Sequence, residues 1–207
     1  MERETTCCFT GHRPDKLPWR DDEWDPRCQA LKERLTAALE EAYDKGMRHF
    51  ICGMAKGAKF LNKDINVYSL LGDGELAEGQ IWEATMFAAH YHLDNLCIIV
   101  DLNGLQIDGR TCDVMNTAPV DKKFEAFGCN VISINGHDFA DIEKAMNFFH
   151  ANHGTGKPTA ILMTTVKGKG VSYMENQAGW HGKAPNDEEY AQAMAELAQA
   201  RKAIEEA

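Results

Sequence analysis

Short apolar runs alternate along the chain with stretches of helical periodicity. Runs of strand length occupy residues 5–10, 49–52, 66–71, 96–100, 130–134 and 159–165. Apolar residues at three- and four-residue spacing predict helices over residues 31–43, 75–93, 121–127 and 139–149, and a turn at 53–57 leads into a further helix. This regular order of strands and helices predicts an α/β protein.

The last predicted helix begins at a capping pattern. Asn186 and Glu189 have the spacing of a capping box variant, in which each side chain bonds the backbone amide of the other residue. We expect the helix to pack on the domain through the apolar stripe that follows, formed by Tyr190, Met194, Leu197 and Ala198.

The predicted strands are nearly continuous apolar runs and do not alternate with polar residues. Strands of this kind are buried on both faces, so we expect a parallel sheet with helices on both faces. Such sheets bind ligands at the carboxyl ends of their strands. Candidate functional residues are therefore expected in the loops that follow the strands.

Composition and charge narrow the classes of function. The 207 residues include 22 Lys and Arg against 32 Asp and Glu, and 44% are hydrophobic. This excludes a disordered chain, and the lack of a basic run argues against nucleic acid or an anionic membrane as a partner. No leader or membrane-length apolar segment is visible, so we expect a cytoplasmic protein. The seven cysteines form no C-x-x-C pair and predict no disulfide framework or structural zinc site, and Cys97 is expected to be a buried hydrophobe.

The loop after residue 71 combines glycines with an acidic side chain. Gly72-Asp73-Gly74 lets the backbone approach a diphosphate and turn into a helix. Asn103 follows the next strand 30 residues later (103 − 73), and one crossover would bring both side chains to the same sheet edge. A carboxylate, an amide oxygen and a backbone carbonyl suit magnesium, with calcium as the alternative. The other interpretation is a strand-to-helix turn whose aspartate caps the helix.

Taken together, these motifs resemble one known family. The stretch from Gly72-Asp73-Gly74 to Asn103 resembles the thiamine diphosphate motif, and residues 58–207 resemble the later part of the N-terminal subunit of split bacterial and archaeal transketolases. The supporting stretches are residues 72–84, 101–109, 134–139, 166–170 and 180–185. The resemblance implies a thiamine diphosphate-binding fold that is present in part.

The resemblance implies roles for particular residues. Asp73, the side chain of Asn103 and the main-chain oxygen of Leu105 would bind magnesium. Gly72 and Gly74 would lie against the diphosphate of the cofactor. The cofactor site is therefore expected in the loops after two neighbouring strands.

Two more residues take a role from the resemblance. Glu78 would lie near the subunit interface behind the thiazolium, and His181 would face cofactor and substrate as a proton-transfer or polarising group. Without the family, Glu78 is an acid in a first helical turn and His181 a solvated loop histidine. Lys167 and Lys169 could contact a phosphate or be solvated.

The resemblance also implies an activity and a partner. Transketolases use thiamine diphosphate to transfer a two-carbon ketol unit between sugar phosphates in the pentose phosphate pathway. In that family the glutamate that activates the cofactor lies in a pyrimidine-binding domain. We therefore expect the partner to be a separate C-terminal pyrimidine-binding subunit, the assembly to be oligomeric, and the enzyme to be incomplete and inactive when this chain is alone.

The beginning of the chain does not resemble transketolase. Residues 7–19 and 49–55 resemble the start of small bacterial proteins of the SLOG nucleotide-sensing superfamily. The predicted domains are a truncated SLOG-like strand-helix-strand segment at 1–56 and the transketolase-like part at 57–207, joined near Gly53-Met54-Ala55. Beside the transketolase interpretation, two alternatives stay open: a nucleotide-binding module and a folded but inactive fusion fragment.

Overall fold

The computed structural model describes residues 26, 30 and 50–206. The chain divides into two compact units, residues 1–48 and 49–207, and the second unit contains the sheet and the helices that cover it. The strand predicted at 5–10 and the helix predicted at 31–43 lie outside the described residues. The same holds for most of the SLOG-like segment, of which only Pro26, Ala30 and the residues from 50 onward are described.

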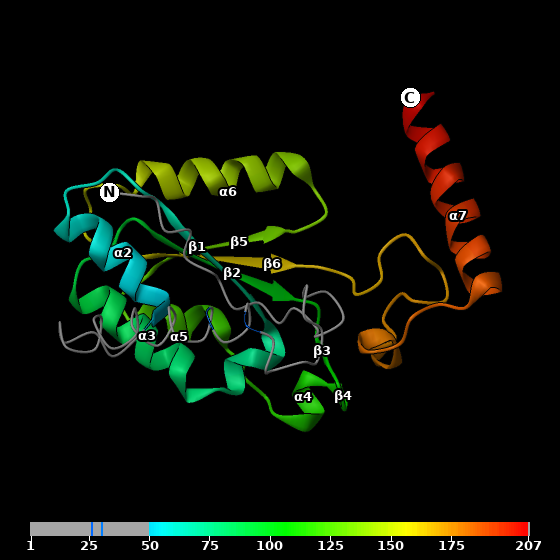
Figure 1. Ribbon diagram of the computed structural model, residues 1–207, viewed down its shortest axis with the longest axis horizontal. Helices are drawn as coiled ribbons and strands as arrows, with labels where there is room; N and C mark the ends of the chain where they lie inside the picture. The colour runs from blue at the N-terminus through cyan, green and yellow to red at the C-terminus, as the bar shows by residue number, and fades with distance from the viewer. Residues whose placement is uncertain (1–25, 27–29, 31–49, 207) are drawn as a thin grey trace. The chain divides into compact units, whose positions relative to one another are not determined.

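A parallel sheet of four strands forms the centre of the described fold. Its order is β1 (Val67–Gly72), β2 (Leu96–Leu102), β6 (Thr159–Thr164) and β5 (Asn130–Asn135) (Figure 1). All three neighbouring pairs are parallel. The predicted α/β fold with a parallel sheet is confirmed.

Helices cover both faces of this sheet. On one face, α2 (Phe50–Phe60), α3 (Gly79–His90) and α5 (Val120–Ala126) pack with the inward side chains of the strands. On the other face, α6 (Phe139–Ala151) packs through Ala145 and Phe149 (Figure 1). The two layers bury the central strands, because β2 and β6 contribute side chains to both cores.

The outer strands are less buried than their apolar sequences predict. Among the described strands, β1 has one neighbour only, and its side chains Tyr68 and Leu70 are 43% and 64% exposed. Phe139, predicted on the buried face of α6, is exposed because it begins the helix. A continuous apolar run therefore identified these strands but not how far each is covered.

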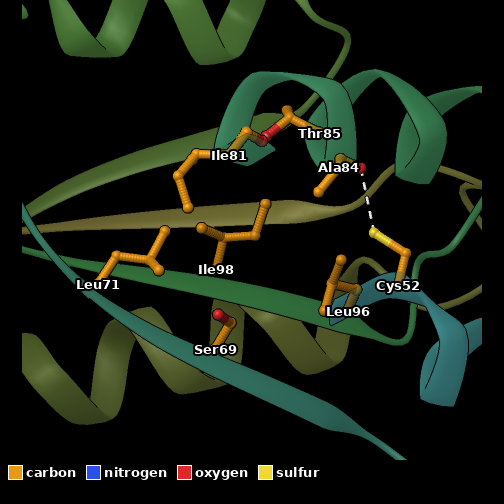
Figure 2. A pocket seen from close by; sticks show the side chains of 8 residues that line it. All are labelled: Cys52, Ser69, Leu71, Ile81, Ala84, Thr85, Leu96 and Ile98. Atoms are coloured by element: carbon orange, nitrogen blue, oxygen red, sulfur yellow. Dashed lines mark hydrogen bonds between the residues drawn. The ribbon is translucent and has the colours of Figure 1, made fainter. Parts of the chain in front are cut away.

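The strand predicted at 49–52 is wrong, and so is the turn after it. Residues 50–60 form the continuous helix α2. Its small side chains Cys52, Ala55 and Ala58 are buried at three-residue spacing, which suits a helix packed closely on its neighbour. The thiol of Cys52 donates to the carbonyl oxygen of Ala84 on α3 at 3.0 Å (Figure 2). This packing outweighs the local apolar pattern.

The helix predicted at 75–93 is divided. Residues Asp73–Ala77 form the 3-10 helix η2, and α3 begins at Gly79 after a break at Glu78, whose backbone is extended. The carboxylate of Glu75 accepts a hydrogen bond from the amide of Gly72 at 2.5 Å, and the indole of Trp82 donates to the carbonyl of Leu76 at 2.9 Å. These bonds hold the tight first turn apart from α3.

The last helix, α7 (Asp187–Glu205), confirms its cap but not its buried face. Asn186 and Glu189 form the predicted capping box. Of the predicted stripe, Tyr190, Met194 and Leu197 are 58%, 47% and 43% exposed, and Ala198 is exposed as well. The polar face is the one that packs: Glu196 accepts from the amide and hydroxyl of Ser172, both at 2.7 Å.

Small elements connect the layers after β2 and β6. They are β3 (Leu105–Gln106), β4 (Gly109–Arg110), α4 (Thr111–Val114) and the 3-10 helix η3 (Ala178–His181). The short strand β3 contacts both η2 and η3. None of the helices in the described part of the chain is long and apolar enough to span a bilayer.

Candidate functional site

The loops after β1, β2 and β6 meet at the carboxyl edge of the sheet. The register pairs Gly72 with Asp101, and Leu102 with Thr164. Asp73, Asn103 and Thr165 therefore follow directly on three neighbouring strands. This geometry brings Asp73 and Asn103 to one edge of the sheet, as expected, while their role as metal ligands stays a prediction.

Asp73 is a buried carboxylate with one unpaired oxygen. The residue is 4% exposed. Oδ2 accepts a hydrogen bond from the amide of Gly104 at 2.6 Å, while Oδ1 is buried and has no hydrogen-bond partner among the described residues. Burial raises the pKa of Asp73 above its ordinary value, the amide dipoles of Gly104 and Gly74 offset part of that rise, and the charge of Asp101 adds to it. Within residues 50–206, this carboxylate has no ion-pair partner.

Asn103 lies between two groups that bond its amide from opposite sides. Its Oδ1 accepts from the backbone amide of Leu105 at 2.9 Å, and its Nδ2 donates to Oδ2 of Asp101 at 3.1 Å. Gly104 makes the turn between Asn103 and Leu105 with a positive φ of 76°, which a side chain would disfavour. The loop thus presents an amide oxygen beside the carboxylate of Asp73.

The oxygen atoms at this edge fit a hard divalent cation. Oδ1 of Asp73 is unpaired in the described structure, Oδ1 of Asn103 uses one of its two lone pairs, and Leu105 adds a main-chain oxygen in the same loop. Magnesium and calcium prefer such donors. Nowhere in residues 50–206 do three His, Cys, Asp or Glu side chains gather as a metal site. An ion here would need amide, carbonyl and ligand oxygens beside the single carboxylate.

The two glycines around Asp73 serve different purposes. A Cβ on Gly74 would stand 3.0 Å from Cβ of Gln106, so only glycine lets β3 approach this turn. The amide of Gly72 is bonded to Glu75. Oε1 of Gln106 is buried without a partner in the described structure, directly beside Gly74. The turn is therefore held closely on both sides.

Glu78 and His181 lie in separate local networks. Glu78 is exposed at the break before α3, where its carboxylate accepts from the side-chain amide of Gln80. His181 is exposed at the end of η3, with its Nδ1 3.5 Å from Nζ of Lys167. Because η3 contacts β3, His181 belongs to a segment that borders the Asp73 loop. The structure therefore brings Asp73 and Asn103 together and leaves Glu78 and His181 in neighbouring segments.

A hollow opens beside Asp73 on the side of α5. Its volume is about 410 Å³, and it is lined mainly by residues 111–112 and 116–121, with Asp73, Leu102 and Leu162. Cavities that hold small molecules are of this size. Two residues to which the sequence pattern assigned no role, Asp101 and Thr165, complete this edge, and the only sequence signal for them is their position at the ends of β2 and β6.

Residues 49–203 match the family profile described as "Transketolase, thiamine diphosphate binding domain". The chain belongs to the transketolase family. It is 43% identical over 145 residues to a subunit of the apulose-4-phosphate transketolase of Actinobacillus succinogenes, which covers 70% of this chain and 51% of that protein. It is 41% identical over 145 residues to the 6-deoxy-6-sulfo-D-fructose transketolase subunit SqwG of a Clostridium species, with 70% and 52% covered.

A solved transketolase shares the fold. The structure of transketolase from Campylobacter jejuni matches with a TM-score of 0.62 and 35% identity, over 68% of this chain and 22% of that chain. The four-stranded parallel sheet is therefore part of the thiamine diphosphate-binding fold of transketolases. The chain spans about half the length of the subunit relatives it matches.

The transketolase match begins before the predicted join. It starts at residue 49, and α2 is continuous across Gly53-Met54-Ala55. None of the matches reported above supports a SLOG-like interpretation of residues 1–56. The boundary between segments 1–56 and 57–207 stays a prediction.

Proposed function

We propose that this chain is the cofactor-binding part of a cytoplasmic transketolase, which binds thiamine diphosphate and magnesium for the transfer of a two-carbon ketol unit between sugar phosphates. The observation that carries the proposal is Oδ1 of Asp73, buried and unpaired in the described structure, beside the amide of Asn103. A divalent cation would supply the missing positive charge, and a diphosphate would supply further oxygens to it.

The residues divide the work of binding. Asp73, Oδ1 of Asn103 and the main-chain oxygen of Leu105 would hold magnesium, or calcium as the alternative ion. Gly72 and Gly74 would let the backbone lie against the diphosphate, since a side chain on Gly74 would collide with Gln106. The bound cofactor supplies the carbon–carbon bond chemistry, and the protein orients it.

Two exposed residues take the outer roles. His181 would face cofactor and substrate and hold or move a proton there, with the ammonium of Lys167 beside its Nδ1. Glu78, exposed between η2 and α3, would meet the neighbouring subunit behind the thiazolium.

We infer that the active enzyme is an oligomer containing a second, pyrimidine-binding subunit. Two of the relatives named above are subunits of transketolases, and this chain covers about half of each. The carboxylate that activates the cofactor would come from that partner, so the chain alone would be inactive.

Isothermal titration calorimetry of thiamine diphosphate into the purified chain tests the proposal. Binding with magnesium present, and its loss when the ion is removed with a chelator, is the expected result. ATP titrated under the same conditions tests the nucleotide-binding alternative. Binding of ATP without thiamine diphosphate, or of neither ligand, would overturn the proposal.

A further inference from the structure

The carboxylate of Asp101 joins two loops at the proposed cofactor site. Asp101 stands near the end of β2, beside Gly72 on one side and Met163 on the other. Its Oδ2 accepts from Nδ2 of Asn103 at 3.1 Å, and its Oδ1 accepts from the hydroxyl of Thr165, directly after β6. One side chain therefore connects the loop that carries Asn103 to the next strand of the sheet.

We propose that Asp101, anchored by Thr165, is a positioning residue that holds the amide of Asn103 with its oxygen directed toward the metal. This inference rests on the proposed function, because it assigns the support of one ligand in the proposed magnesium site.

The chemistry of the partners fixes which end of the amide faces where. An ionised carboxylate only accepts hydrogen bonds, so only the NH2 end of Asn103 can face Asp101. The backbone amide of Leu105 only donates, so only the oxygen can face it. With the amide reversed, both bonds would be lost and nitrogen would stand where a cation needs oxygen. Asp101 thus selects the productive orientation.

Thr165 in turn limits the rotation of Asp101. Without its hydroxyl, Oδ1 of Asp101 would lose this donor, and the carboxylate could turn away from Asn103. Groups that orient a metal ligand through one hydrogen bond commonly account for about 10- to 100-fold of metal affinity. Magnesium demands stricter octahedral geometry than calcium, so a loosely held ligand should weaken magnesium more.

Four variants of the full chain separate orientation from charge. Asp101→Asn keeps the size of the side chain but can present NH2 or oxygen to Asn103. Thr165→Val removes the hydroxyl, and Thr165→Ser retains it. Asp108→Asn removes an equal charge from the exposed turn between β3 and β4 and serves as the control. The probes are magnesium and calcium, each titrated with saturating thiamine diphosphate in calorimetry.

We expect Asp101→Asn to weaken magnesium binding about 10- to 100-fold and calcium binding less, so that the ratio of the two dissociation constants changes. Thr165→Val should show a smaller loss in the same direction, and Thr165→Ser should restore affinity. Asp108→Asn should stay within about twofold, because solvent and salt screen an exposed charge.

Three results would overturn parts of this scheme in distinguishable ways. If the unmodified chain binds no thiamine diphosphate with either ion, the proposed function fails and this inference with it. If it binds and Asp101→Asn matches it, only the positioning role fails. If magnesium and calcium weaken equally in both Asp101→Asn and Thr165→Val, in parallel with a loss of stability in urea, the role of the pair is structural and the proposal is wrong.

Discussion

The carboxylate of Asp73 accepts a hydrogen bond of 2.6 Å from the backbone amide of Gly104, which lies 31 positions later in the chain. The bond depends on the parallel pairing of β1 with β2, because that pairing places the ends of both strands at one level. It satisfies one oxygen of Asp73 and fixes the position of the buried second oxygen. Cation binding at this edge would therefore begin from a carboxylate that is already oriented.

Replacement of Asp73 tests that orientation. Asp73→Asn should weaken magnesium-dependent binding of thiamine diphosphate by more than about 100-fold, beyond the usual effect of a supporting residue. The melting temperature without metal should not fall, since Oδ1 of the buried carboxylate has no partner in the described structure. Calorimetry and thermal unfolding measure both effects, with Asp108→Asn as the control. Unchanged affinity in the Asp73 variant would exclude Asp73 as a ligand.

His181 should matter for turnover and not for folding. In a complex restored to activity with a pyrimidine-binding subunit, His181→Ala should lower kcat by about 10²- to 10⁴-fold, the range for a proton-transfer group. Its melting temperature should stay the same because the side chain is exposed. His150→Ala, at an exposed position on α6, is the matched control. A normal kcat, or a strongly lowered melting temperature, would contradict the assignment.

The chain alone should have no appreciable transketolase activity, even when it binds magnesium. A displacement of about 1 Å in a cofactor site can cost on the order of a hundredfold in rate, and here a whole activating carboxylate is expected from another subunit. A coupled assay with a ketose phosphate donor and an aldose phosphate acceptor measures this, with and without such a subunit. Turnover near about one per second by the chain alone would refute the prediction.

Asp94 should make part of the folding stability depend on pH. Burial alone would raise its pKa, but the Lys59 ammonium and the amides of Gly156 and Gly154 outweigh burial and hold the pKa below its ordinary value. A lowered folded pKa means that the stabilisation is present above the unfolded pKa, about 3.9, and is lost as pH falls through the folded value.

The corresponding variant is Asp94→Asn. Its free energy of unfolding in urea should be lower than that of the parent by about 1–3 kcal/mol at pH 7, because charge-assisted hydrogen bonds are lost. The difference should shrink as pH falls below about 4, where the parent also becomes protonated. Asp64→Asn, at an exposed position, should show no such difference. A gap that is equal at pH 7 and pH 3 would contradict the role of the charge.

The described cysteines should react with thiol reagents in two classes. Cys52, Cys97 and Cys129 are buried, and burial raises the pKa of each thiol to about 12. Cys112 is exposed at the rim of the hollow beside Asp73. In the native chain, iodoacetamide followed by peptide mapping should label Cys112 and spare the other three until guanidinium unfolds the protein. Native labelling of Cys97 would show that the core beneath α6 opens.

The sequence predicted the parallel α/β fold and the meeting of Asp73 with the Asn103 loop, because strand length and crossover length are local properties. It did not predict the helix at residues 50–60, whose small residues become informative only when packed on α3. The exposed face of α7 was missed for a similar reason, since the bonds from Ser172 to Glu196 depend on distant segments. The bond between Asp101 and Thr165 also spans two strands, and no local pattern marks it.

The sheet edge at β1 has a consequence for how this gene can vary. All the candidate ligands lie in loops after β1 and β2, and the supporting Thr165 follows β6. The mutual register of these three strands is set by their own pairing and involves no residue before Val67. A recombination event upstream of α2 can therefore exchange the preceding segment while the three loops keep facing one another. The described part behaves as a portable half-site, one that different N-terminal sequences can inherit without rebuilding it.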